Sequence, residues 1–200
     1  LSEAAKTIER RLVEAVTIDH IFQSQDLTIP LPDFLSVDTE GSEYEILLGA
    51  RETLKSNIVA LVVETEFHPL HKGQKVFGDL AELLLDLGFD FIRFLNLQEL
   101  SPVRAPLGLR GEGFHTVCNA LFFKKLNNID THEEKVKGRL MLRKLSFIAI
   151  VFNQFEYALG CLRQSKNLID YHQDSQEEEP VYLRFLREFE QHIDKMPLVY

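Results

Sequence analysis

The feature that most constrains the fold of this chain is an alternation of short apolar runs with segments of helical periodicity. Four runs have the length of buried strands: residues 34–37, 58–63, 89–95 and 116–123. Apolar residues recur at helical spacing between the first three runs, and a loop rich in proline and glycine joins the last two. This order is typical of a parallel sheet covered by helices, and a last strand reached through a loop adds an antiparallel edge strand. The sequence therefore predicts an α/β fold with a mostly parallel sheet.

Local signals predict where the helices begin and end. Ser42 with Glu45 three residues later forms a capping box, and apolar residues continue this helix to Leu54. A second helix is predicted from Asp79, and Gly88 stops it. Residues 12–22 are enriched in β-branched side chains, which predicts an extended segment.

The pattern becomes helical after Lys125. Residues 131–168 predict two helices with a break near Asn153, and Pro180 suits the first turn of a final helix. We therefore predict a sheet domain over residues 1–125 and a small α-helical annex over residues 126–200. An annex of about 65 residues has a marginal core of its own, so we expect it to dock on the sheet domain or on a second chain.

Bulk properties exclude several classes of function. The formal net charge is −9 with no basic stripe, which argues against a nucleic-acid partner. The longest apolar run, Leu145–Phe152, falls far short of the roughly 20 residues of a membrane-spanning helix, so no membrane partner is predicted. Cys118 and Cys161 lack any metal or redox spacing. Two buried free thiols indicate a reducing compartment, and we predict a cytoplasmic protein.

Acidic residues gather where two predicted strands end. Asp38 and Glu40 follow the first strand, Glu64 and Glu66 close the second, and His68 comes shortly after. In open α/β sheets ligands bind beyond the carboxyl ends of the strands, so these side chains are the candidates for chemistry. A carboxylate here suits the abstraction of a proton.

Simpler explanations remain open for parts of this cluster. Glu43 is well placed to interact with the helix dipole, and Glu40 shares that explanation. His68 and His71, together with the two glutamates of the second strand, have the residue types of a metal site. Their spacing matches no specific zinc signature, and we predict no bound metal.

Several motifs together resemble the FkbM methyltransferase family. They are Thr17-Ile18-Asp19, the run from Phe34 to Glu43 with Val37-Asp38-Thr39-Glu40-Gly41 at its centre, Leu48-Gly49-Ala50, Val63 to Phe67, Lys72-Gly73-Gln74, Phe77 and Leu87-Gly88-Phe89. The resemblance spans about residues 15–125. Ser36 departs from the pattern, because the family often has lysine there.

The resemblance implies the C-terminal part of a Rossmann-like methyltransferase sheet. It implies methyl transfer from S-adenosylmethionine to a hydroxyl oxygen of a sugar or small molecule. By the resemblance, Asp19, Asp38 and Gly41 are candidates for contact with the cofactor. Asp38 is the first candidate for a catalytic role, followed by Glu40, then Glu64 or Glu66, and last His68.

One element of a complete cofactor site is missing from the sequence. It contains no glycine-rich strand-to-helix loop and no acidic residue placed to hold the ribose, so we expect a partial methyltransferase domain. Two alternative functions follow. One is a non-catalytic binding or oligomerisation module derived from a methyltransferase, and the other is a metal-dependent hydrolase. A homo-oligomer would form through the helical annex or through an unpaired edge of the sheet.

Overall fold

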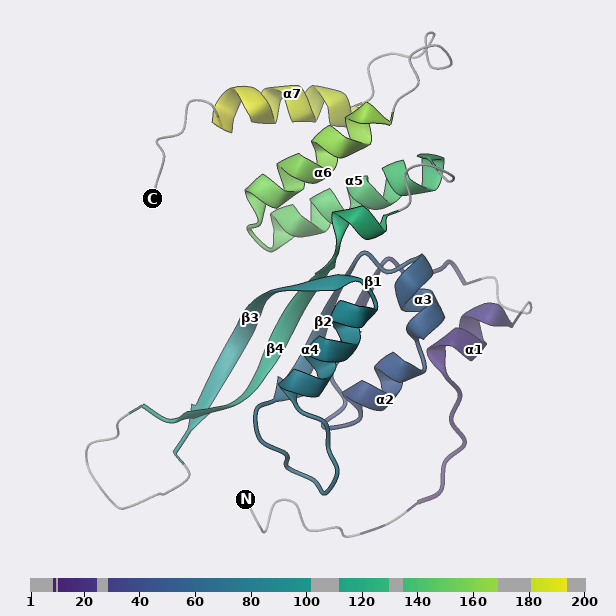
Figure 1. Ribbon diagram of the computed structural model, residues 1–200, viewed down its shortest axis with the longest axis vertical. Helices are drawn as coiled ribbons and strands as arrows, with labels where there is room; N and C mark the ends of the chain where they lie inside the picture. The colour runs from purple at the N-terminus through teal and green to yellow at the C-terminus, as the bar shows by residue number, and fades with distance from the viewer. Residues whose placement is uncertain are drawn as a thin grey trace.

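The computed structural model describes residues 9, 11–24, 29–101, 112–129, 135–168 and 181–193, and Figure 1 shows how their helices and strands are arranged. The elements in chain order are α1 (Ile18–Gln23), β1 (Phe34–Val37), α2 (Glu43–Leu48), α3 (Arg51–Ser56), β2 (Ala60–Glu66), α4 (Phe77–Asp86), β3 (Phe89–Leu100), β4 (Phe114–Lys124), the 3-10 turn η1 (Leu126–Asn128), α5 (Lys135–Val151), α6 (Phe155–Asn167) and α7 (Val181–Ile193). The predicted α/β class is confirmed.

The four strands form one sheet in the order β1-β2-β4-β3. β1 and β2 are parallel, whereas β4 is antiparallel to both of its neighbours, so the prediction of a mostly parallel sheet is wrong. The sequence predicted the last strand as an antiparallel edge, and its position is wrong: β4 lies inside the sheet, between β2 and β3. The reason is its composition, because Leu121, Phe122 and Phe123 are buried and an edge position would leave one side of their strand unpaired.

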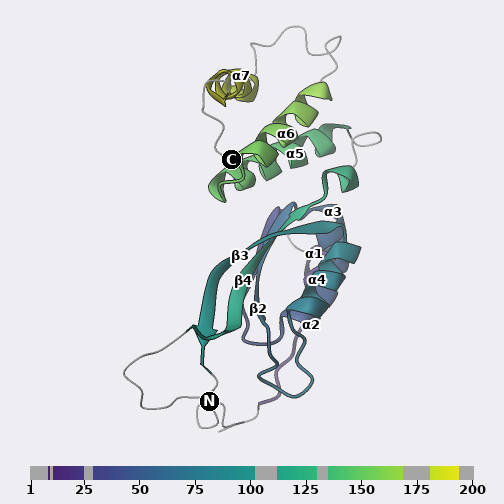
Figure 2. The same ribbon diagram turned by 60° about the vertical axis from the view of Figure 1, so that its left-hand side comes forward.

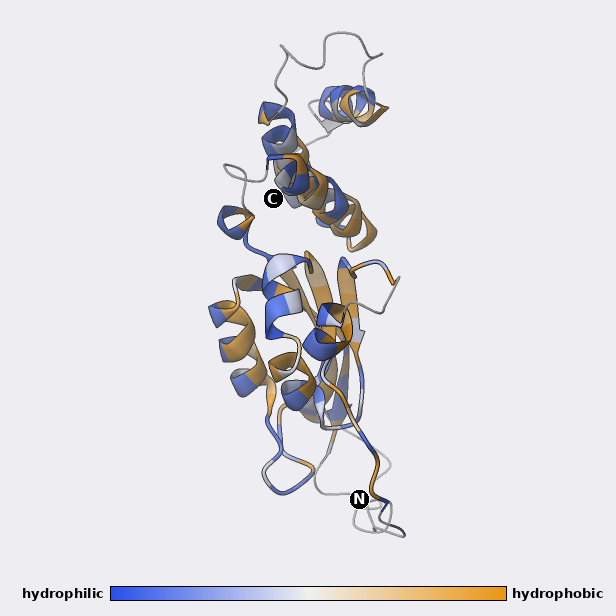
Figure 3. Cartoon of the chain, turned by 90° about the vertical axis from the view of Figure 1, so that its right-hand side faces the viewer, coloured by the Kyte–Doolittle hydropathy of each residue, from blue (hydrophilic) through white to orange (hydrophobic). Residues whose placement is uncertain are grey.

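The two faces of the sheet are covered by different elements. On one face, Leu61, Val63 and Phe122 pack with buried residues of α2, α3 and α4. On the other, Ala60, Leu121 and Phe123 pack with α5 and α6, so these helices dock on the sheet, which is one of the two arrangements expected. Figure 2 shows α1–α4 on one side of the sheet and the α5–α6 pair beyond one end of it, and Figure 3 shows that the strands and the inner sides of the helices are mostly apolar.

The helix predicted from Ser42 to Leu54 is present as two short helices, α2 and α3, with Gly49 at the junction. A β-carbon on Gly49 would lie 3.0 Å from Cγ2 of Thr17, so glycine allows the earlier chain to approach closely here. The backbone N–H of Asp19 donates to the carbonyl of Gly49 at 2.9 Å. The packed chain around α1 therefore interrupts the helix, which local periodicity alone does not reveal.

Other local predictions need smaller corrections. Residues 12–22 are not a strand: Thr17 caps α1 by accepting from the backbone N–H of His20 at 3.1 Å. α4 begins at Phe77, two residues before the predicted start at Asp79. The carboxylate of Asp79 accepts from the backbone N–H of Val76 at 3.1 Å. The break near Asn153 is confirmed, since α5 ends at Val151 and α6 begins at Phe155. The capping residues predicted at 131–134 and Pro180 lie outside the described residues.

A buried lysine joins the sheet to the end of α3. The ammonium of Lys124 donates to the carbonyls of Leu54 at 3.0 Å and Ile58 at 3.4 Å, and also to that of Lys55. Burial lowers the pKa of Lys124 to about 8. Tyr157 of α6 donates to the Lys124 carbonyl at 3.0 Å, so the same residue links α3, β4 and the annex. Among the described helices, none has the length and apolar character to cross a membrane.

Candidate functional site

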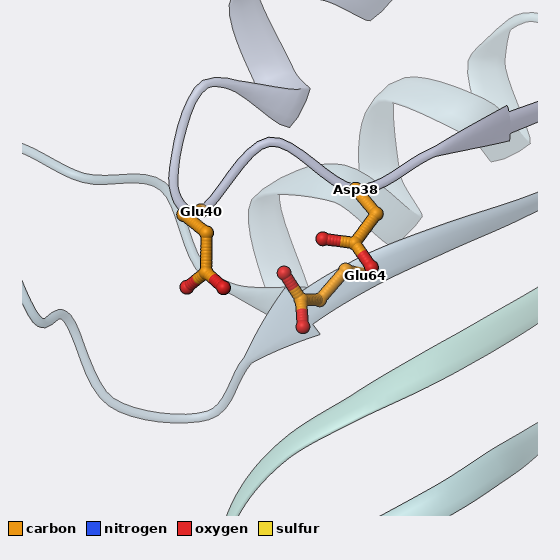
Figure 4. Close-up of side chains that lie close together, drawn as sticks. All are labelled: Asp38, Glu40 and Glu64. Carbon is orange, nitrogen blue, oxygen red and sulfur yellow. The ribbon is translucent and has the colours of Figure 1, made fainter.

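The ends of two neighbouring strands bring three carboxylates together. β1 and β2 are parallel and adjacent, so the loop after β1 lies beside the last residues of β2. Oxygen atoms of Asp38, Glu40 and Glu64 all lie within 4.8 Å of one another. Figure 4 shows these side chains converging from the loop and from β2. The sequence-based expectation that the two strand ends meet is confirmed.

The loop after β1 is held in shape by a buried glutamate. The Glu43 carboxylate accepts from the N–H of Thr39 at 2.6 Å, from its hydroxyl at 2.8 Å and from the N–H of Gly41 at 2.9 Å. Only 3% of Glu43 is exposed. Ser42 makes no side-chain capping bond, so the predicted capping box is replaced by this contact from Glu43 back to the loop.

Two features require glycine at position 41, its backbone conformation and the close approach of a neighbouring loop. The φ of Gly41 is 115°, in the left-handed region that favours glycine, and the preceding Glu40 also has a positive φ of 58°. A β-carbon on Gly41 would lie 3.1 Å from Nε2 of Gln74 and 3.4 Å from Cδ2 of His71. The loop after β1 is therefore packed against the loop after β2, and this packing turns Glu40 toward the other carboxylates.

The electrostatics of the site centre on Glu64. The pKa of Glu64 is raised to about 7, first by burial and then by interaction with the Asp38 carboxyl group. The negative charges of Asp38, Glu40 and Glu66 add further. Two carboxyl groups can share a hydrogen bond only when one of them carries a proton. Asp38 and Glu64 therefore form an acid pair in which Glu64 keeps its proton to a higher pH than an ordinary glutamate.

Glu66 is the most deeply buried acid on β2, with 2% of its surface exposed. Burial raises the pKa of Glu66, and the charge of Glu43 raises it further. His68 and His71 are exposed in the loop that follows. Among the described residues, neither histidine belongs to a group whose ligand atoms lie close enough together to hold a metal ion. The carboxylates of Asp38, Glu40 and Glu64 do form such a group. Carboxylate oxygens alone suit hard cations such as Mg²⁺ or Ca²⁺ and do not make a histidine–carboxylate zinc centre.

Two of the residues predicted for cofactor contact make internal contacts. The Asp19 carboxylate accepts from the N–H of Glu52 at 3.0 Å, and from the N–H and hydroxyl of Thr53 at 2.8 and 2.7 Å. These are the contacts of a helix cap at α3, away from the acid pair. The N–H of Gly41 donates to Glu43. The third residue predicted for cofactor contact, Asp38, is exposed, and its side chain lies beside that of Glu64 (Figure 4).

The strand register brings in a residue that the sequence analysis missed. Asn119 of β4 is the direct cross-strand partner of Glu64. Asparagine is depleted in strands, so its presence in the last apolar run was a signal that could have been noticed. Its partner could not be found without the order of the strands.

Comparison with known families adds to this geometry. Residues 1–91 match the family model described as the methyltransferase FkbM domain. Residues 1–91 are thus similar to the FkbM methyltransferase domain, in agreement with the resemblance found in the sequence. No curated protein and no solved structure matches the chain. The matched FkbM segment includes all three converging carboxylates and ends within β3, so β4 and the annex lie outside it.

Proposed function

We propose that this chain forms the methyl-acceptor side of an S-adenosylmethionine-dependent methyltransferase that methylates a hydroxyl group of a sugar or another small molecule. The similarity of residues 1–91 to the FkbM methyltransferase domain supports methyl transfer. The observation that carries the choice of a hydroxyl acceptor is the acid pair of Asp38 and Glu64. A hydroxyl must lose its proton when its oxygen is methylated, and a base with a pKa near the working pH is the best catalyst of that step.

The residues of this chain fit one part of the methyl donor. S-adenosylmethionine carries a positive sulfonium and an ammonium group, and the carboxylates of Asp38, Glu40 and Glu64 attract cations. Asp38 and Glu40 are the residues that would face this positive charge. The nucleoside part of the donor has no such match, because the sequence contains no glycine-rich loop. When bound, the donor supplies an electrophilic methyl group.

The chain's own residues then have separate tasks. Glu64, in its ionised form, accepts the proton of the acceptor hydroxyl. Asp38 lies beside Glu64, and its negative charge helps to raise the pKa of Glu64. Glu43 positions the loop by its contacts with Thr39 and Gly41. Glu66 supports the negative potential from a buried position, and His68 is an exposed, more distant candidate for the base.

The test combines binding with turnover. S-adenosylhomocysteine is titrated calorimetrically into this chain and into the product of the complete reading frame, and labelled methyl transfer is measured on a panel of sugars and small alcohols. We expect binding in at least the longer protein and a loss of turnover of at least about 100-fold in Glu64→Gln, with binding retained. Unchanged turnover in Glu64→Gln would contradict its role as the base. No binding to either protein would reject the cofactor and favour the non-catalytic module.

Two further expectations accompany this proposal. Cys118 and Cys161 are buried free thiols, which supports a reducing, cytoplasmic setting. β1 pairs with β2 on one side, and exposed apolar residues of α5 such as Phe147 and Val151 lie outside the core. Both features support self-association through the sheet edge or the annex, and light scattering that shows a monomer at every concentration would reject it.

A further inference from the structure

The loop after β2 is folded around the side chain of Gln74. Its Oε1 accepts from the backbone N–H of Leu70 at 2.7 Å and from that of His71 at 3.0 Å. A side-chain amide carries an acceptor oxygen at one end and a donor nitrogen at the other, so these two backbone donors fix which end is the oxygen. The NH₂ end of Gln74 is therefore the end that reaches beyond its own loop.

The NH₂ end of Gln74 lies between the two loops of the candidate site. Its Nε2 would be 3.1 Å from a β-carbon on Gly41, in the loop after β1. Nε2 is withdrawn from water and makes no regular hydrogen bond with any described residue. It still acts on Glu66: burial and the charge of Glu43 raise the pKa of Glu66, and the Gln74 side chain opposes them. The amide thus faces the loop after β1 on one side and the end of β2 on the other.

The backbone of the loop after β1 is strained at Glu40. The φ of Glu40 is 58°, in the left-handed region that costs a residue other than glycine free energy. Such a conformation persists where the surrounding structure holds it. Glu43 holds the loop by accepting from the N–H of Gly41 at 2.9 Å, and at the same glycine the loop also meets the side chains of Gln74 and His71. Of these two, Gln74 has its side chain anchored by two hydrogen bonds, so it is the second firm support of the strained turn.

We propose that Gln74 is a positioning residue: it fixes the loop after β1 against the loop after β2 and so holds Glu40 beside the Glu64 carboxylate. This inference rests on the proposed function, in which Glu64 is the base. Oxygen atoms of Glu40 and Glu64 lie within 4.8 Å of each other. The interaction between two charges weakens with their separation and with water between them. A loop released from Gln74 therefore changes the charge that Glu64 experiences.

A role confined to its own loop is the simpler explanation of Gln74. The two N–H groups that Oε1 accepts from would then be its whole contribution, and the acid group would not depend on it. The burial of Nε2 against Gly41 favours the wider role, since a donor withdrawn from water without a regular partner costs free energy that the packing of the two loops must offset. The two explanations differ in what happens to the coupling between Glu40 and Glu64 when the amide is removed.

The test is an NMR titration of the Glu64 side-chain carboxyl carbon in pairs of proteins with and without Glu40→Gln. In the native chain we expect Glu40→Gln to lower the Glu64 midpoint by roughly half a pH unit, the effect of a charge about 5 Å away through water. In Gln74→Ala we expect this shift to fall to less than about half of its native size. Gln74→Met, which keeps the length of the side chain and removes its amide, gives the same comparison if Gln74→Ala does not fold. Leu70→Ala is the matched control: Leu70 is exposed in the same loop and its backbone N–H still donates to Gln74, so the native shift should be retained.

The outcomes separate this inference from the proposed function. An undiminished shift in Gln74→Ala or Gln74→Met would overturn the inference, as would an equal loss in Leu70→Ala. No effect of Glu40→Gln in the native chain would also overturn it, because Glu40 would then not stand beside Glu64 in solution. The titration needs neither methyl donor nor acceptor, so its result is independent of calorimetry with S-adenosylhomocysteine. A coupling that depends on Gln74 in a protein that binds no S-adenosylhomocysteine refutes the methyltransferase proposal alone, and a coupling independent of Gln74 in a protein that binds it refutes this inference alone.

Discussion

At the scale of single residues, the acidic turn after β1 divides into side chains that build the loop and side chains that face the candidate site. Glu43 is buried and accepts from Thr39 and Gly41, whereas Asp38 and Glu40 are exposed. The sequence places all of these acids in one turn and does not separate their roles. The separation depends on which carboxylate the loop folds around. In the structure that carboxylate belongs to Glu43, and the loop packs against Gln74 at Gly41.

Removal of Glu43 should destabilise the loop strongly. Glu43→Ala leaves the part-buried N–H groups of Thr39 and Gly41 without their acceptor, so we expect a loss of about 2 kcal/mol in the free energy of unfolding. Urea denaturation measures it. The control is Glu45→Ala on the same helix, which is exposed and should change stability by less than about 0.5 kcal/mol. Equal effects of the two substitutions would show that Glu43 does not hold the loop.

At the scale of elements, the sequence identifies most helices and strands and misplaces several of their ends. β1 and the break between α5 and α6 agree with the prediction, because each depends on a local signal. The split of the predicted helix into α2 and α3 was missed because its cause is distant in sequence. Asp19 caps α3 from more than 30 residues away, and no local pattern reveals a cap of that kind.

The cap at α3 is testable. Burial raises the pKa of Asp19, but hydrogen bonds from Glu52 and Thr53 outweigh it and leave the pKa lowered. Asp19→Ala should reduce stability by about 1 kcal/mol, while Asp19→Asn, which keeps a capping oxygen, should lose less. The pKa is depressed, so this stabilisation is present above the unfolded pKa of 3.8 and is lost as pH falls through the folded value. Thermal unfolding at pH 7 and pH 3 checks both parts, and a full loss in Asp19→Asn would argue against a capping role.

At the scale of the whole molecule, strand order was the main thing that the sequence could not supply. A run of apolar residues fits an edge or an internal strand equally well, and only pairing with both β2 and β3 places β4 inside. That order also places Asn119 directly opposite Glu64. The meeting of Asp38 with Glu64 was predictable, since the carboxyl ends of neighbouring parallel strands share one edge. The division at residue 125 into two domains stays a prediction.

The stability of the whole chain should depend on pH through the acid pair. The folded pKa of Glu64, about 7, lies above its ordinary value of 4.5. The protonated form therefore contributes stability that is fully present below the unfolded pKa and is lost as pH rises through about 7. Glu64→Gln mimics the protonated acid. We expect the native chain to lose about 1 kcal/mol relative to Glu64→Gln between pH 5 and pH 8, after allowance for screening by water. Parallel urea curves that keep a constant difference across this range would contradict the prediction.

The central claim is that burial and Asp38 raise the pKa of Glu64 and that Glu64 can accept a proton from an acceptor hydroxyl. The most direct measurement is a titration of the Glu64 side-chain carboxyl carbon by NMR, in the native chain and in Asp38→Asn. The account predicts an inflection near pH 7 in the native chain, moving toward the ordinary value of 4.5 when Asp38 is replaced. A Glu64 carboxyl that titrates near its ordinary value in both proteins would contradict the acid pair and remove the main support for Glu64 as the base.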